Sequence, residues 1–406
     1  MEGGYGEVSV YDRLGVKTII NAAGPATRLG GTLMDSEVLR AMTEAAGAYV
    51  KMDELQEAAG RVIAQITGAE AGYVTSGAAA AMALATAACM TGVDPVKINR
   101  LPDSRGMKDQ VIIQRAHRYD YDHAIRSVGA TLVEVGFPDL TFAYDIEAAI
   151  TCETAAIAYY PVRSRPSVPL HTVADIAHRH GIPVIVDAAL EVPPTENLRR
   201  YIQEGADLVA FSGGKAIRGP QASGILCGRA DLIRAVALHN LDMDVRPETW
   251  TYQRMIDEGR IPGPPYHGIG RSMKVGKEEI VGLLVALERY VRQDHATIRA
   301  EWLNKLASIR NALSEIDGLT VTIVEEPLGG LAVPYALVQL DEHKLGITAY
   351  QLLNGLQECD PPIYLIEEPA WRGAVAVSPM TLQDGDELAI VHAIPQVLKH
   401  VARGRT

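Results

Sequence analysis

Two short segments decide the fold: PVIVD at residues 183–187 and FSGGK at residues 211–215. The first is an apolar run of strand length that ends in Asp187. The second closes another apolar run with a glycine turn and Lys215, and residues 198–203 between the two have a helical pattern. Strand, helix and strand in this order form a βαβ unit, whose strands run parallel. We therefore expect Asp187 and Lys215 at the carboxyl edge of a parallel sheet, where open α/β sheets bind ligands.

The same alternation of apolar runs and amphipathic segments continues from about residue 70 to 240, and it predicts an α/β fold with a mostly parallel sheet. Strands are expected at residues 72–75, 110–114, 131–135, 155–160, 183–186, 208–211 and 224–227, and helices at 78–90, 122–128, 172–180 and 198–203. A helical stretch at 277–313 and a smaller alternation after it predict a second, smaller α/β domain. The expected division is an N-terminal segment 1–50, a large domain 51–285 and a small domain 286–406. The proline-rich residues 242–268 predict a long functional loop.

Composition limits the partners of the chain. Of 406 residues, 48% are hydrophobic and 22% are charged, as in folded proteins. The formal net charge of −12 argues against a nucleic-acid partner or an anionic membrane surface, because both require clustered Lys and Arg. The longest apolar stretch, at residues 78–90, is shorter than the roughly 20 residues of a membrane span.

The N-terminal sequence and the spacing of the cysteines and histidines bear on cellular location and metal binding. No signal peptide is apparent, and the four cysteines show no CxxC spacing. His178 and His180 do not share a helix face, so they make no persuasive metal site. We expect a cytoplasmic protein with no disulfide, no metal site and no membrane contact.

Asp187 and Lys215 match the way in which many enzymes hold pyridoxal 5′-phosphate (PLP). In such enzymes a lysine forms a Schiff base with the cofactor, and a carboxylate keeps the pyridine nitrogen protonated so that the ring accepts electrons. Each residue also has a simpler interpretation, as a surface lysine in a turn and as a helix-capping or ion-paired aspartate. A Walker A phosphate loop is excluded, since Val209 and Ala216 stand where it requires Gly and Ser or Thr.

Candidates for the remaining cofactor contacts also follow predicted strands. Ser76, Gly77 and Ala78 lie between a strand and the Ala-rich helix, where backbone N–H groups make a phosphate site. Simple capping of that helix by Ser76 is the alternative. Ser212 is a further candidate phosphate ligand. His117 is a candidate for stacking on the cofactor ring, and a structural histidine is the alternative.

Arg271 and Arg372 are candidates for binding a substrate carboxylate. A guanidinium group matches a carboxylate through two parallel hydrogen bonds, so arginine is the expected residue type for this task. Each of the two is also compatible with a surface position or an ordinary ion pair.

The segment ADLVAFSGGK at residues 206–215, followed by GPQASG at 219–224, resembles the PLP-lysine signature of bacterial selenocysteine synthase, the L-seryl-tRNA selenium transferase family. The chain looks closer still to the tRNA-independent relatives of that enzyme, typified by D-glucosaminate-6-phosphate ammonia-lyase. INAAG at 20–24, LGG at 29–31 and MKVGKEE at 273–279 are similar to those relatives too. The resemblance covers residues 10–290 well and the C-terminal third weakly.

The resemblance implies a fold-type I PLP enzyme, a homodimer or higher homo-oligomer with active sites at the subunit interface. It implies that Lys215 is the Schiff-base lysine and Asp187 the partner of the pyridine nitrogen. By the same resemblance, Ser76, Gly77 and Ser212 hold the phosphate, His117 stacks on the ring and Gln221 lies near the cofactor. Arg218 stands where selenocysteine synthase has a small residue, and it joins Arg271 and Arg372 as a candidate for binding a substrate carboxylate or phosphate.

The reaction expected from the residues and the resemblance is PLP-dependent α,β-elimination. The substrate would be a small amino acid or amino sugar acid with a β-leaving group, and the products a 2-keto acid and ammonia. Racemisation or transamination by the same cofactor is the first alternative, and a non-catalytic PLP-fold binding protein is the second. The acidic charge and the short N-terminal segment make tRNA an unexpected substrate.

Overall fold

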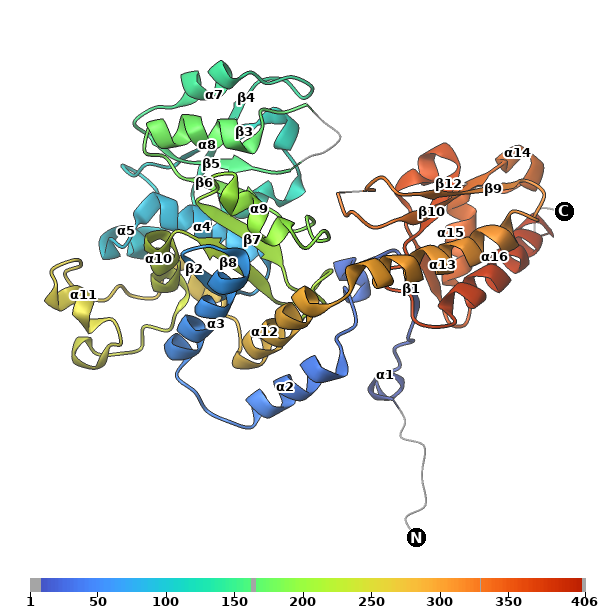
Figure 1. Ribbon diagram of the computed structural model, residues 1–406, viewed down its shortest axis with the longest axis horizontal. Coiled ribbons are helices and arrows are strands. Elements are labelled where there is room, and N and C mark those ends of the chain that lie inside the picture. The colour runs from blue at the N-terminus through green and yellow to red at the C-terminus, as the bar shows by residue number, and fades with distance from the viewer. Residues whose placement is uncertain (1–8, 162–165, 329, 404–406) are drawn as a thin grey trace, which may run out of the picture. The chain divides into compact units, whose positions relative to one another are not determined.

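The computed structural model describes residues 9–161, 166–328 and 330–403 (Figure 1). The chain divides into two compact units, one of Met1–Leu33 with Gln293–Thr406 and the other of Met34–Arg292. This division differs from the expected boundaries after residues 50 and 285. The first 33 residues group with the C-terminal part because β1 (Ile20–Ala22) pairs in parallel with β11 (Ile363–Leu365).

The larger unit is built on a seven-stranded sheet with the order β2-β8-β7-β6-β5-β3-β4 (Figure 1). Its strands are β2 (Ala71–Thr75), β3 (Gln110–Gln114), β4 (Thr131–Val135), β5 (Thr154–Tyr159), β6 (Val184–Asp187), β7 (Leu208–Ser212) and β8 (Gly224–Gly228). Strand β8 runs antiparallel to both of its neighbours, and the other neighbouring strands run parallel. The predicted α/β fold with a mostly parallel sheet is confirmed, and each strand begins and ends within one residue of its predicted position.

Helices cover both faces of this sheet. The α-helices described in this unit are α2 (Ser36–Ala46), α3 (Met52–Thr67), α4 (Ala78–Thr91), α5 (Pro95–Arg100), α6 (His123–Ser127), α7 (Ala143–Ala149), α8 (Leu170–Arg179), α9 (Asn197–Gln203), α10 (Ala230–Asn240), α11 (Gln253–Asp257) and α12 (Lys277–Arg292). In β7, Val209 and Phe211 belong to one core cluster, with residues of α3, α8, α9 and α12. Leu208 and Ala210 belong to the other, with residues of α4 and α10. Alternate side chains of a strand point to opposite faces, so both faces are buried.

Two predictions about the loops and helices need correction. The stretch expected as one helix at 277–313 is two helices, α12 and α13 (His295–Leu313). Asp294 begins the second by accepting hydrogen bonds from the N–H groups of Ala296 and Thr297. The proline-rich segment 242–268 is not an open loop, because it contains α11 and its Trp250 lies in a small apolar cluster with Ile98 of α5.

The smaller unit contains a three-stranded antiparallel sheet with the order β12-β10-β9, besides the β1–β11 pair. Its further strands and α-helices among the described residues are β9 (Leu319–Val324), β10 (Tyr335–Leu340), β12 (Ala374–Val377), α1 (Val10–Arg13), α13, α14 (Glu342–Leu345), α15 (Ala349–Gln357) and α16 (Asp386–Arg403). Apolar side chains from both sheets and from α13, α15 and α16 form its core. Among the described residues, no helix combines the length and the apolar character needed to cross a membrane.

Candidate active site

Asp187 and Lys215 follow neighbouring strands at the same edge of the sheet. Asp187 is the last residue of β6 and lies opposite Ala210 of β7 in the parallel register. Strand β7 ends at Ser212, and Lys215 lies in the turn that follows. The βαβ arrangement expected from the sequence therefore brings the carboxylate and the lysine to the carboxyl edge of two adjacent strands.

The turn that carries Lys215 is held by backbone hydrogen bonds and by close packing. The N–H of Gly213 donates to the carbonyl of Ser223 at 2.9 Å, and the N–H of Gly219 donates to the carbonyl of Gly213 at 2.8 Å. A Cβ atom at position 214 would lie 2.7 Å from the Cα atom of Gln221. Gly214 is therefore required so that the segment carrying Gln221 can pack against the lysine turn.

Asp187 is a buried carboxylate with a donor on each oxygen. Only 5% of the Asp187 surface is exposed to solvent. Oδ1 accepts from the N–H of Ala189 at 3.0 Å, and Oδ2 accepts from the hydroxyl group of Tyr119. Burial raises the pKa of Asp187, while the Tyr119 hydrogen bond and the positive charge of Lys215 act in the opposite direction.

Burial shifts the pKa of Lys215 in the opposite direction to that of Asp187. Burial lowers the pKa of Lys215 because it disfavours the ammonium form, and the negative charge of Asp187 opposes this effect. At neutral pH the side chain therefore holds a larger fraction of neutral amine than an exposed lysine. A neutral amine is the form that can form a Schiff base or accept a proton.

The predicted phosphate segment, residues 76–78, lies at the N-terminus of α4. Gly77 is the N-cap residue, with φ of +135°, a conformation that favours glycine. The Ser76 hydroxyl group donates to the carbonyl of Met273 at 3.0 Å and does not cap the helix, so the simple capping alternative is wrong. The first N–H groups of the helix, from Ala78 onward, have no partner within the helix and favour an anion.

Strand β8 joins the phosphate segment to the lysine turn. Gly224 lies opposite Ser212 in the antiparallel register. A Cβ atom at Gly224 would lie 2.5 Å from the carbonyl carbon of Gly77 and 2.8 Å from the amide nitrogen of Ala78. Ser212 and the N-terminus of α4 are thus brought together through Gly224, and both predicted phosphate-binding segments belong to one region.

His117 is fully buried, with an exposure of 0%, at the end of the 3-10 helix η2 (Arg115–His117). Its Nδ1 accepts from the N–H of Tyr160 at 3.4 Å, and its ring packs edge-on against Tyr159 with centroids 4.6 Å apart. Burial lowers the pKa of His117 to about 4, so the ring is neutral at pH 7. Because Nδ1 accepts, the tautomer assigned by the hydrogen bond carries its proton on Nε2, which has no partner among the described residues.

These features fit PLP, a cofactor with an anionic phosphate, a ring nitrogen and a ring oxygen. The N-terminus of α4 suits the phosphate, Asp187 suits the ring nitrogen and Lys215 suits the aldehyde carbon. The buried Nε2–H donor of His117 requires an acceptor, because an unsatisfied buried donor is costly. A cofactor or substrate oxygen would provide that acceptor.

The three predicted substrate arginines lie in different surroundings. Arg218 has φ of +58°, a left-handed conformation that is uncommon outside glycine, and Asp35 and Arg289 are charged neighbours. Arg372 is exposed at the end of η6 (Glu368–Arg372) in the smaller unit.

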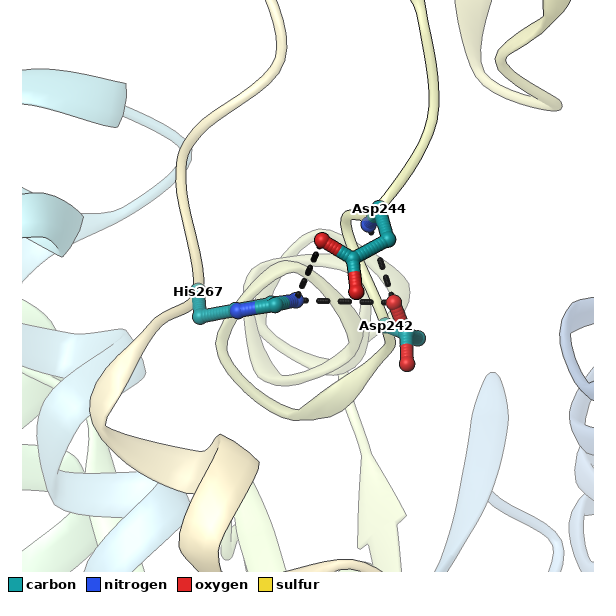
Figure 2. Close-up of side chains that lie close together, drawn as sticks. All are labelled: Asp242, Asp244 and His267. Atoms are coloured by element: carbon teal, nitrogen blue, oxygen red, sulfur yellow. Dashed lines mark hydrogen bonds and ion pairs between the residues drawn. The ribbon is translucent and has the colours of Figure 1, made fainter.

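Arg271, at η5 (Ile269–Met273), binds an acidic cluster in the proline-rich segment. Its Nη2 lies 2.9 Å from Oδ2 of Asp242. Figure 2 shows Asp242 and Asp244 with His267, whose Nε2 lies 3.4 Å and 3.8 Å from the two carboxylates. The three exposed residues have the atoms to hold a cation. Asp242 already has an ion pair with Arg271 and a hydrogen bond with His267, so its carboxylate oxygens have partners within the protein.

The profile of L-seryl-tRNA selenium transferase matches residues 19–252 of the chain. The chain belongs to the L-seryl-tRNA selenium transferase family. It is 34% identical to D-glucosaminate-6-phosphate ammonia lyase of Salmonella typhimurium, over 97% of this chain and 99% of that protein. It is also 34% identical to 5′-C-glycyluridine monooxygenase-decarboxylase of a Streptomyces species, over 96% of this chain and 92% of that protein. A solved structure of D-glucosaminate-6-phosphate ammonia-lyase matches with a TM-score of 0.80 and 32% identity, over 98% of this chain and 100% of that one.

Sequence reasoning missed the aromatic residues that surround Asp187 in this member of the selenium transferase family. The ring of Tyr119 stacks on that of Tyr160 with centroids 4.3 Å apart and an interplanar angle of 8°. A signal was present, since each tyrosine follows a strand, β3 or β5, and these two strands are neighbours. Aromatic residues at the carboxyl ends of adjacent parallel strands are candidates for the same site as Asp187.

Proposed function

We propose that the protein is a PLP-dependent lyase that catalyses α,β-elimination from a small amino acid or amino sugar acid. The observation that carries the proposal is the buried Asp187 beside the half-buried Lys215 at the edge of β6 and β7. It is supported by the similarity to an ammonia lyase over nearly the full length of both proteins. PLP is the cofactor, and the substrate is a small molecule.

The residues of the site divide the work of elimination. PLP, when bound, supplies an electron-accepting ring that makes the Cα proton of an amino acid removable. Lys215, whose pKa burial lowers, accepts the proton from Cα as a neutral amine. The same side chain then donates a proton to the departing β-hydroxyl group, which leaves as water. Hydrolysis of the dehydrated product uses one water and gives a 2-keto acid and ammonia.

Asp187 and His117 act on groups other than the Cα proton. Asp187 provides the negative charge that favours a protonated ring nitrogen. The Nε2–H of His117 donates to an oxygen of the cofactor or substrate. The N-terminus of α4 and Ser212 bind the phosphate, and Arg218 binds an anionic group of the substrate.

The second relative favours a second candidate function. The Streptomyces protein is named a monooxygenase-decarboxylase, and its identity to this chain is the same 34%. A reaction of that class on an amino acid consumes O2 and releases CO2, whereas elimination requires neither. We prefer the lyase because a solved structure of an ammonia-lyase matches the chain with a TM-score of 0.80 over nearly its full length.

The proposal also covers the oligomeric state and the cellular location of the protein. We infer a homo-oligomer with active sites at subunit interfaces, as the resemblance implies, and a cytoplasmic protein. Analytical ultracentrifugation of the PLP-loaded protein measures the first directly. A monomer that retains full activity would contradict it.

The deciding experiment measures ammonia release by the PLP-loaded protein. The substrates are a panel of D- and L-amino acids and amino sugar acids, with no keto-acid acceptor, each assayed in air and without oxygen. We expect ammonia and a matching keto acid under both conditions. Oxygen-dependent CO2 release would favour the monooxygenase-decarboxylase, and exchange of Cα–H with solvent without ammonia would favour a racemase or aminotransferase.

A further inference from the structure

We propose that Tyr119 is a positioning residue, which orients the Asp187 carboxylate and keeps it ionised for the ring nitrogen of the cofactor. The inference rests on the proposed function, because it assigns a task to a residue beside the cofactor's acidic partner. Tyr119 is not expected to contact the reacting atoms of the substrate. Its effect passes through Asp187.

The hydrogen bonds of Asp187 leave room for the cofactor. Oδ2 accepts from the hydroxyl group of Tyr119, and Oδ1 accepts from the N–H of Ala189 at 3.0 Å. A carboxylate offers about four acceptor positions, so two remain for a ring N–H. The Tyr119 hydrogen bond can therefore persist when the cofactor is present.

Packing fixes the hydroxyl group of Tyr119 in place. Its ring lies nearly parallel to that of Tyr160, 4.3 Å away at 8°. The backbone N–H of Tyr160 in turn donates to Nδ1 of His117 at 3.4 Å, and Tyr159 packs edge-on against the same histidine. The ends of β3 and β5 thus form one aromatic cluster that connects His117 to Asp187.

The hydrogen bond from Tyr119 matters because the Asp187 carboxylate must stay negatively charged to stabilise the protonated ring nitrogen. A buried carboxylate loses hydration, which favours its neutral form, and a neutral acid cannot stabilise a positive ring nitrogen. Tyr119 and Ala189 replace part of the lost hydration with hydrogen bonds to the ionised form. Among the described residues, Lys215 acts electrostatically on Asp187, Tyr160 and Asp122 act on Tyr119, and Glu191 acts on the neighbouring Tyr160. Of these, only Lys215 carries a positive charge in its protonated form.

The protonation of Tyr119 suits the role of donor. Burial, followed by the nearby charge of Asp187, raises the pKa of the Tyr119 hydroxyl group far above its usual value. The phenol therefore stays protonated throughout the physiological pH range. Tyr119 can donate to Asp187 and does not compete with it for negative charge.

The test compares two isosteric variants, Tyr119→Phe and Tyr160→Phe, in the PLP-loaded protein. Each removes one phenolic oxygen from the same stacked pair, but only Y119F removes a hydrogen bond to Asp187. The first readout is the 15N chemical shift of PLP labelled at its ring nitrogen, with Asp187→Asn as the reference for an unprotonated ring. The second is kcat and KM for ammonia release.

We expect the ring nitrogen of Y119F to shift toward the position seen in D187N, and that of Y160F to stay at the wild-type position. We also expect kcat of Y119F to fall about ten-fold with KM changed less than three-fold, since a lost hydrogen bond to a charged group is worth roughly one order of magnitude. A wild-type nitrogen shift in Y119F overturns the proposal. Equal effects in Y119F and Y160F, or failure of Y119F alone to fold, would assign the hydroxyl group to packing and overturn it as well.

These outcomes are separate from those that test the lyase. The nitrogen shift requires only bound PLP, so it can be measured even if the reaction is not an elimination. If wild-type protein binds PLP but releases no ammonia, the lyase proposal fails and the Tyr119 inference is still decided by the 15N measurement.

Discussion

At the scale of single residues, burial acts on Asp187 and Lys215 in opposite directions. It raises the pKa of the carboxyl group and lowers the pKa of the amine, and each charge partly opposes the effect on the other. A surface pair of the same residues would show neither effect, because water stabilises both charges. The position of the pair at the edge of two buried strands is therefore what makes Lys215 a suitable base.

Replacing Lys215 with alanine tests this assignment. We expect K215A to lose ammonia release by about 10²–10⁴-fold, the range for removal of a general base, and to lose the absorbance of covalently bound PLP. Lys108→Ala is the control, because Lys108 is an exposed lysine of the same unit. Full activity in K215A would end the proposed mechanism.

Arg218 combines an unfavourable backbone conformation with a candidate role in substrate binding. Its φ of +58° costs a non-glycine residue about 1 kcal/mol. We expect Arg218→Gly to leave the free energy of unfolding unchanged or raise it slightly, while KM for an anionic substrate rises about ten-fold or more. Urea unfolding and steady-state kinetics measure the two effects. Arg218→Lys keeps both the strain and the charge, and an unchanged KM in R218G would remove this residue from the substrate site.

At the scale of elements, three chain segments meet where β8 begins. The N-terminus of α4, the end of β7 and the start of β8 approach so closely that only glycine fits at position 224. The phosphate segment and the lysine turn are far apart in the sequence but share this contact. The spacing between the proposed phosphate site and the proposed Schiff-base lysine therefore depends on the packing of β8.

Gly224→Ala should disturb this junction. The added Cβ atom would lie 2.5 Å from the carbonyl carbon of Gly77, so backbone must move. We expect PLP affinity to fall at least ten-fold and the free energy of unfolding to fall by about 1–3 kcal/mol, as for overpacking. Gly263→Ala is the matched control, because no heavy atom lies within 4 Å of its added Cβ. Fluorescence titration with PLP measures the affinity, and equal affinities in the two variants would contradict the expectation.

At the scale of the whole molecule, two buried histidines couple stability to pH. His117 and His239 each have a pKa lowered to about 4 by burial, against about 6.5 in an unfolded chain. Between these values the unfolded state binds more protons than the folded state. Stability therefore falls as pH decreases from 6.5 to 4, with a slope of up to about 1.4 kcal/mol per pH unit for each histidine.

His239 offers the cleaner test because it lies outside the proposed cofactor site. Its Nε2 lies 2.9 Å from the hydroxyl oxygen of Thr91, between α10 and α4. We expect His239→Gln to flatten the dependence of unfolding free energy on pH between 6.5 and 4. His123→Gln, at an exposed position of α6, is the control for replacing a histidine, and a wild-type slope in H239Q would contradict the expectation.

Much of this architecture could be predicted from the sequence because its signals are local. Apolar runs of strand length located all seven strands of the main sheet within one residue. The βαβ rule then placed Asp187 and Lys215 at one sheet edge without knowledge of any other contact. The prediction of a phosphate site at the glycine and hydroxyl residues before α4 rests on a local signal of the same kind.

Other features were decided only by the tertiary structure, because they depend on contacts between segments distant in the sequence. The pairing of β1 with β11 moved the N-terminal residues into the smaller unit, and the ion pair with Asp242 gave Arg271 a partner in the proline-rich segment. The hydrogen bond from Tyr119 to Asp187 joins the segment after β3 to the end of β6, and these two strands are not adjacent in the sheet. By itself, the sequence determined which residues end the strands. Tertiary packing decided which of those residues meet, because side-chain contacts form only after the strands have been ordered and aligned.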